Sequence, residues 1–200
     1  MFDAAVKTNR ILDMDGISQG ALSNGNDAPP PVIELQQFDF AVLRYIWTSE
    51  SGKDLDTRTV VTQPARNVSV GWARNSSDNG YLTWGGDNRQ DGVESVLIDI
   101  SKLSNDYSQQ ESFEVLCRAF WFNTKGTGNL EIEFETYKGG SMNQQGYNFV
   151  NSNGMLVQSL KIAVNTTIQQ SSDIEGDLLA KVTYNPRTLT GQLITVQHAL

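Results

Sequence analysis

The chain has 200 residues, a hydrophobic fraction of 38% and a formal net charge of −8. This length suits one globular domain with a sizeable core, and no apolar run is long enough to span a bilayer. A negatively charged chain repels phosphate groups, so we expect neither nucleic acid nor a membrane as a partner. The first residues lack the basic and apolar regions of a secretion signal, which favours a cytoplasmic location, or the virion if the source is viral.

Cysteine and histidine are each present once. Cys117 alone cannot form an internal disulfide framework, and it lies in an apolar run typical of core cysteines. His198 lies too close to the C-terminus to be held rigidly as a catalytic base. The sequence therefore assembles no nucleophile, base and orienting group, and we expect no catalytic residues and no enzymatic activity.

Residues 1–31 differ from the rest of the chain, because they are polar and end in three consecutive prolines. Such a segment cannot bury enough apolar surface to fold alone, and the prolines favour an extended conformation. Two interpretations remain, a loose tail and an extended N-terminal arm that becomes ordered against a neighbouring subunit. The candidate anchors of such an arm are Phe2, Val6, Ile11 and Leu12.

From Val32 to the C-terminus the pattern predicts roughly ten short strands separated by turn residues. The clearest strand alternates Leu130, Ile132 and Phe134 with three glutamates, which predicts one buried and one solvated face. Only residues 103–112 suit a short helical turn. The sequence therefore predicts an all-β domain over residues 32–200, an antiparallel β-sandwich of the jelly-roll kind.

Turn residues predict two hairpins in the second half of the chain. The loop 123–128 (NTKGTG) has the length and composition to join the strands 112–122 and 129–137 as a hairpin. The dipeptide Asn185-Pro186 predicts a second hairpin close to the C-terminus.

Acidic residues are concentrated in two segments between Lys53 and Ser101. Asp54 and Asp56 bracket one leucine, so on a strand their side chains would share a face. The candidate ligands of a metal site assembled from both segments are Asp54, Asp56, Asp87, Asn88, Asp91 and Glu94. Calcium takes about six to eight oxygen ligands in irregular geometry, so these residues predict a calcium site at one end of the sandwich. The alternative is that the residues of the second segment only make turns, which close a hairpin between residues 81–84 and 93–100.

The same segments carry a family resemblance. The DLD element, followed by GDN-x-x-D-G-x-E and by a strand ending in D-x-S-K-L, resembles the TerD-type tellurite-resistance stress proteins over residues 53–103. It is also similar to bacterial sandwich domains of adhesin-like proteins. The resemblance implies a β-sandwich that binds calcium through the six candidate ligands. After GDN the chain departs from the denser glycine and aspartate run of the family, and Arg89 offers the acids another positive charge.

Aromatic and acidic side chains suggest two further kinds of site. Trp72 and Trp84 lie at strand ends beside polar loops, where exposed rings could stack on a glycan, although most tryptophans in sandwiches belong to the core. Paired carboxylates can hydrolyse glycosides. However, Glu131, Glu133 and Glu135 share the predicted solvated face of one strand, and we interpret them as surface residues.

Three functions remain open. The sequence favours a structural or assembly protein, for instance a phage virion component of the capsid decoration, neck, tail or fibre, because it combines an arm with no catalytic set. The partners of such a protein would be copies of itself or virion neighbours. The alternatives are a calcium-binding module of the TerD or adhesin kind and a carbohydrate-binding module.

Overall fold

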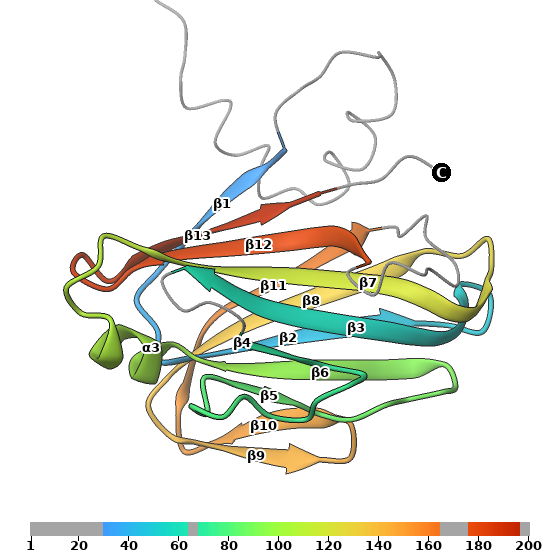
Figure 1. Cartoon of the computed structure of the whole chain (residues 1–200), viewed down its shortest axis with the longest axis horizontal. Helices are drawn as coiled ribbons and strands as arrows, with labels where there is room; N and C mark the ends of the chain where they lie inside the picture. The colour runs from blue at the N-terminus through green and yellow to red at the C-terminus, as the bar shows by residue number, and fades with distance from the viewer. Residues whose placement is uncertain (1–29, 64–67, 165–175, 197–200) are drawn as a thin grey trace, which may run out of the picture.

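The computed structural model describes residues 30–63, 68–164 and 176–196, which form two antiparallel β-sheets packed face to face (Figure 1). The first sheet has six strands in the order β1 (Val32–Leu35), β13 (Thr190–Thr195), β12 (Asp177–Asn185), β7 (Phe113–Lys125), β3 (Gly52–Gln63) and β4 (Val68–Gly71). The second has five, in the order β11 (Met155–Val164), β8 (Leu130–Lys138), β2 (Phe40–Trp47), β6 (Gly92–Asp99) and β5 (Leu82–Trp84). The predicted all-β sandwich is confirmed.

The core lies between the sheets and follows the alternation of the strands. On β8 the residues Leu130, Ile132 and Phe134 are buried, as their spacing predicts. Trp47 of the second sheet and Trp121 of the first meet across the sandwich, with ring centroids 6.2 Å apart and planes at 81°. Edge-to-face contacts of this kind add to the burial energy of large rings. Large side chains from both sheets therefore close the core at the end where β3 begins.

Strand pairing confirms one predicted hairpin and contradicts the other. β12 and β13 are joined by the turn at Asn185 and pair from Ala180↔Thr195 to Asn185↔Thr190. The loop 123–128, in contrast, is not a hairpin, because β7 pairs with β3 and β12 whereas β8 pairs with β2 and β11. This loop crosses from one sheet to the other. The residue composition of a turn indicates that the chain reverses direction there. It does not indicate that the two strands joined by the turn pair with each other.

One short helix, α3 (Ile100–Asp106), lies within the described residues, directly after β6. It begins earlier than the turn predicted at 103–112, because the Asp99 carboxylate accepts a hydrogen bond from the Lys102 backbone N–H at 2.8 Å and caps the helix. Ile100 and Leu103 are buried in the core. No helix in the described ranges is both long and apolar enough to cross a membrane.

A separate hairpin of β9 (Ser141–Gln145) and β10 (Asn148–Ser152) lies against β6 (Figure 1). This hairpin changes the surroundings of the β8 glutamates. Its Asn148 side-chain oxygen and Phe149 carbonyl both accept hydrogen bonds from the Arg44 guanidinium of β2, at 2.7 and 3.1 Å. The same guanidinium pairs with Glu133 at 3.0 Å and Glu135 at 2.5 Å.

The prediction that the β8 glutamates form a fully solvated face is therefore wrong for two of them. The side chains of Glu133 and Glu135 are only 16% exposed, and that of Arg44 is 8% exposed. Glu131 does keep 42% of its side chain exposed. A hairpin distant in sequence converts part of a strand's polar face into a buried ion-pair network.

Candidate metal centre

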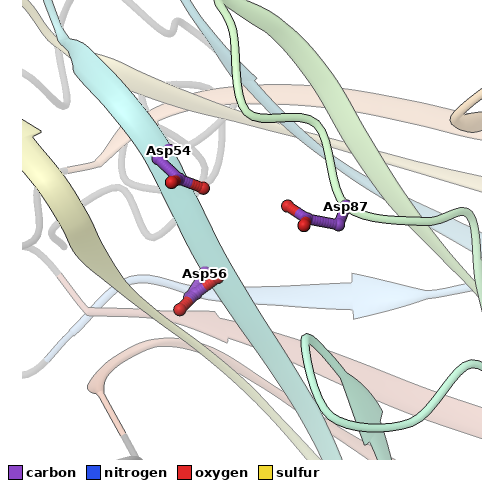
Figure 2. Close-up of side chains that lie close together, drawn as sticks. All are labelled: Asp54, Asp56 and Asp87. Carbon is purple, nitrogen blue, oxygen red and sulfur yellow. The ribbon is translucent and has the colours of Figure 1, made fainter.

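Three carboxylates from two segments come together at one edge of the sandwich. Asp54 and Asp56 lie on β3, and Asp87 lies in the loop between β5 and β6 (Figure 2). One oxygen from each residue lies within 4.8 Å of the corresponding oxygens of the other two, and this is the one such group of acidic or metal-ligating residues within the described ranges. The two acidic segments predicted to share a site therefore do meet.

The local backbone of β3 explains how its two aspartates can face one partner. The register with β7 shifts between Lys53 and Leu55, and Asp54 has a φ of 62°, in the left-handed region that aspartate tolerates better than most residues. The two aspartates therefore converge through an irregularity in the strand rather than through the regular alternation that predicted it.

The β5–β6 loop is tied to β3 by a fully buried carboxylate. Glu94 of β6 is 0% exposed and accepts hydrogen bonds from the Thr57 hydroxyl at 2.7 Å and from the Trp84 indole N–H at 3.2 Å. Its other oxygen accepts the backbone N–H of Asn88 at 2.9 Å. Burial raises the Glu94 pKa to about 8, against the effect of these three donors. Glu94 thus links the two sheets and fixes the loop next to Asp87.

Asn88 holds the same loop from within. Its side-chain oxygen accepts the Gln90 N–H at 3.1 Å, and its amide group donates to the carbonyl oxygens of Asp91 and Val93. The predicted turn at this position is therefore present, and β5 and β6 do pair as a hairpin. Turn formation and the acidic cluster were alternatives from the sequence, yet in the structure the turn is what presents Asp87 to β3.

The electrostatics of the cluster favour a positive charge at its centre. Asp56 is 8% exposed, and no group within the described ranges donates a hydrogen bond to its carboxylate. Burial and, to a smaller extent, the charges of Asp54 and Asp87 together raise its pKa to about 7. The pKa of Asp54 is also raised, first by burial and then by Asp87. Such a cluster is unfavourable unless protons or a cation neutralise it.

Asp87 is the third member, and its two oxygens have different surroundings. Oδ2 accepts a hydrogen bond from Arg89 Nε at 2.8 Å. Oδ1 is buried and has no hydrogen-bond partner among the described residues. In Figure 2 the Asp87 carboxylate points toward β3 and the two other aspartates. The donor set is therefore made only of carboxylate oxygens, which suits hard cations such as calcium and magnesium and not thiolate-preferring metals.

Three of the six predicted ligands form the cluster and three do not. Asn88 and Glu94 use their side chains to position the loop, and Asp91 is exposed and takes no part in the group of three. The prediction that Glu94 coordinates a metal fails because the residue points into the sandwich, toward Thr57 and Trp84.

The two tryptophans predicted as ligand-binding rings differ in exposure. Trp72 is 42% exposed and lines a small pocket with Arg58 and Arg74. Trp84 is 4% exposed and donates its indole N–H to Thr57 Oγ1 at 3.0 Å, so its predicted role as a stacking platform is wrong. The predicted arm, including its anchors Phe2, Val6, Ile11 and Leu12, lies largely outside the described residues, with only residues 30 and 31 inside them.

Arg44 is a candidate functional residue that was not predicted from the sequence. It lies beside a groove on the outer face of the second sheet, lined also by Ile46, Val93, Glu133 and Asn148. The signal was one arginine inside the otherwise apolar strand FAVLRYIW, since a cation there requires an acidic partner across the sheet.

Comparisons of this chain with protein-family models, with curated proteins and with solved structures find no match.

Proposed function

We propose that this chain is a non-enzymatic β-sandwich module that binds a divalent cation, calcium by preference, between β3 and the β5–β6 loop. The observation that carries the proposal is the Asp56 carboxylate, which is 8% exposed, has no hydrogen-bond donor among the described residues and faces two further carboxylates. Two like charges about 5 Å apart repel by about 3 kcal/mol at an effective dielectric constant of 20. A divalent cation would replace this repulsion by attraction.

The chemistry of the cluster favours calcium over magnesium. Three carboxylates can bind in one-oxygen or two-oxygen modes, and their irregular arrangement across a strand and a loop suits the flexible coordination of calcium. Magnesium demands near-ideal octahedral geometry and gives up its water molecules reluctantly. A bound cation would join the β5–β6 loop of the second sheet to β3 of the first, so its expected effect is to stabilise one edge of the sandwich.

The direct test is thermal unfolding of the full chain in calcium and in chelator. A ligand present at a hundredfold excess over its Kd stabilises the folded state by about 2.7 kcal/mol, which for a domain of this size raises Tm by about 5–10 °C. Asp56→Asn should abolish the calcium shift. Asp78→Asn is the matched control, because the Asp78 side chain is 92% exposed and pairs with Arg74 rather than with the cluster. An unchanged Tm of the wild-type chain in millimolar calcium would refute the proposal.

Assembly is a second candidate function, supported by a different feature. β11 is an edge strand, and the side chains at its start are apolar and exposed, Met155 by 63% and Leu156 by 50%. Exposed apolar residues on a sheet edge favour contact with another chain. Light scattering of the full chain and of a variant lacking residues 1–31 tests this candidate. A full chain that is monomeric at high concentration would count against assembly.

A further inference from the structure

Arg89 is the positively charged residue bound to the acidic cluster. It follows Asp87 by two positions in the β5–β6 loop, and its Nε donates to Asp87 Oδ2 at 2.8 Å. Its side chain is 75% exposed, whereas that of Asp87 is 32% exposed. The guanidinium therefore binds the cluster from the solvent side, through a single carboxylate.

The influence of Arg89 extends to all three aspartates. Asp87, Asp54 and Asp56 each raise the pKa of Arg89, and Asp87 has the largest effect. Conversely, Arg89 lowers the pKa of both Asp54 and Asp56, against the effect of burial. Without a metal ion, Arg89 thus supplies positive charge to a site that repels itself.

A guanidinium and a divalent cation cannot share this site without repelling each other. Arg89 is on a long side chain that lies mostly in solvent, so it can turn away without disturbing the core. Its exposed ion pair with Asp87 is of a kind that holds only weakly. Asp87 Oδ1, which is buried and has no partner among the described residues, remains available to a cation.

We propose that Arg89 is a built-in competitor of the cation, which neutralises the empty cluster and lowers its cation affinity. This inference rests on the proposed function and adds its regulation. On cation binding, the ion replaces the Arg89 guanidinium as the positive charge beside the aspartates. The site therefore stays folded when it is empty, and it releases its ion more readily than three aspartates without an arginine would. Within the described residues, the Arg89–Asp87 ion pair is the contact that has to break.

Calcium titration by calorimetry tests the proposal on the full-length chain. Arg89→Gln should bind calcium about two- to sevenfold more tightly than wild type, the effect of a single charge about 7 Å from a divalent ion in water, from moderate to low salt. Arg89→Lys keeps the charge and should stay close to the wild-type affinity. Arg74→Gln removes the same charge from an ion pair with Asp78 elsewhere on the surface, and it should change the affinity less than twofold.

Thermal unfolding in chelator supplies a second measurement, in which Arg89→Gln should lower stability although it raises calcium affinity. Arg89→Gln should lower Tm without calcium, because the aspartates lose their counter-charge, and should show a larger rise in Tm when calcium is added. An Arg89→Gln affinity equal to or weaker than that of wild type would overturn the inference, as would an equal gain in Arg74→Gln. If neither wild type nor Arg89→Gln binds calcium, the proposed cation site itself falls; if only Arg89→Gln binds, the competitor role stands.

Discussion

Replacing Asp56 by asparagine should stabilise the protein in the absence of metal. The pKa of Asp56 rises from 3.8 to about 7 in the folded state. A rise of this size means that the charged form destabilises the folded state by about 4 kcal/mol once ionisation is complete. Asparagine has nearly the same shape and no charge. Its buried amide also lacks hydrogen-bond partners, and the cost of burying it offsets part of the stability gained by removing the charge. We expect a net stabilisation of about 1–2 kcal/mol at pH 8 in chelator.

The effect should depend on pH with a definite sign. Because the folded pKa lies above the unfolded one, the folded state binds the extra proton, and the associated stability is fully present below pH 3.8. It is lost as the pH rises through about 7, where Asp56 ionises in the folded protein. At pH 4 the amide cost remains while the ionisation penalty is nearly absent, so Asp56→Asn should be less stable than wild type by about 2 kcal/mol. It should gain about 4 kcal/mol on wild type across this window and level off as the more stable protein by pH 8.

Urea denaturation in chelator at pH 4, 6 and 8 measures these differences directly, because the midpoint shifts while the slope stays constant. Asp78→Asn should stay within about 0.5 kcal/mol of wild type at every pH, as expected for an exposed surface site. If Asp56→Asn is less stable than wild type at pH 8 in chelator, the Asp56 carboxylate makes favourable contacts and the reasoning is refuted. Saturating calcium should reverse the order and make wild type the more stable protein.

Three further outcomes test other parts of the structure. Arg44→Met should destabilise the fold by about 3 kcal/mol in urea titrations, because it leaves two largely buried glutamates without their guanidinium; a loss below about 0.5 kcal/mol would contradict this. Cys117 is 0% exposed and burial raises its pKa to about 12, so a thiol reagent should label it only after denaturation. Gly52→Ala should lower Tm by several degrees, since a Cβ there would lie 2.5 Å from the Thr124 backbone oxygen and 2.7 Å from the Trp121 ring, and a neutral result would show that both the strand and the ring give way.

The strands and their buried faces could be predicted because that information is local. Each strand alternates along its own sequence, so Leu130, Ile132 and Phe134 identify a core face without knowledge of the neighbours. The same holds for the hairpin at Asn185, whose turn residues and flanking strands are adjacent in the chain. The loop 123–128 was misassigned because an alternating strand packs equally well in either sheet of a sandwich.

The candidate site divides in the same way. The concentration of acids in two segments was enough to predict that Asp54, Asp56 and Asp87 meet. The sequence could not show that Glu94 turns inward, because that depends on where β6 begins relative to the loop and on the donors that Thr57 and Trp84 offer from other strands.

Composition, spacing and alternation thus determined the class of fold, the buried faces and the acidic character of one edge. Only the tertiary structure decided which carboxylates are buried without partners, that Arg89 is the counter-charge of the cluster, and that Arg44 lies beneath a hairpin. The physical reason is that burial and charge pairing depend on segments distant in sequence. The sequence records an aspartate or glutamate in the same way whether it lies in solvent, in an acidic cluster or in an ion pair. The groups around it in the folded protein determine its charge and its contacts.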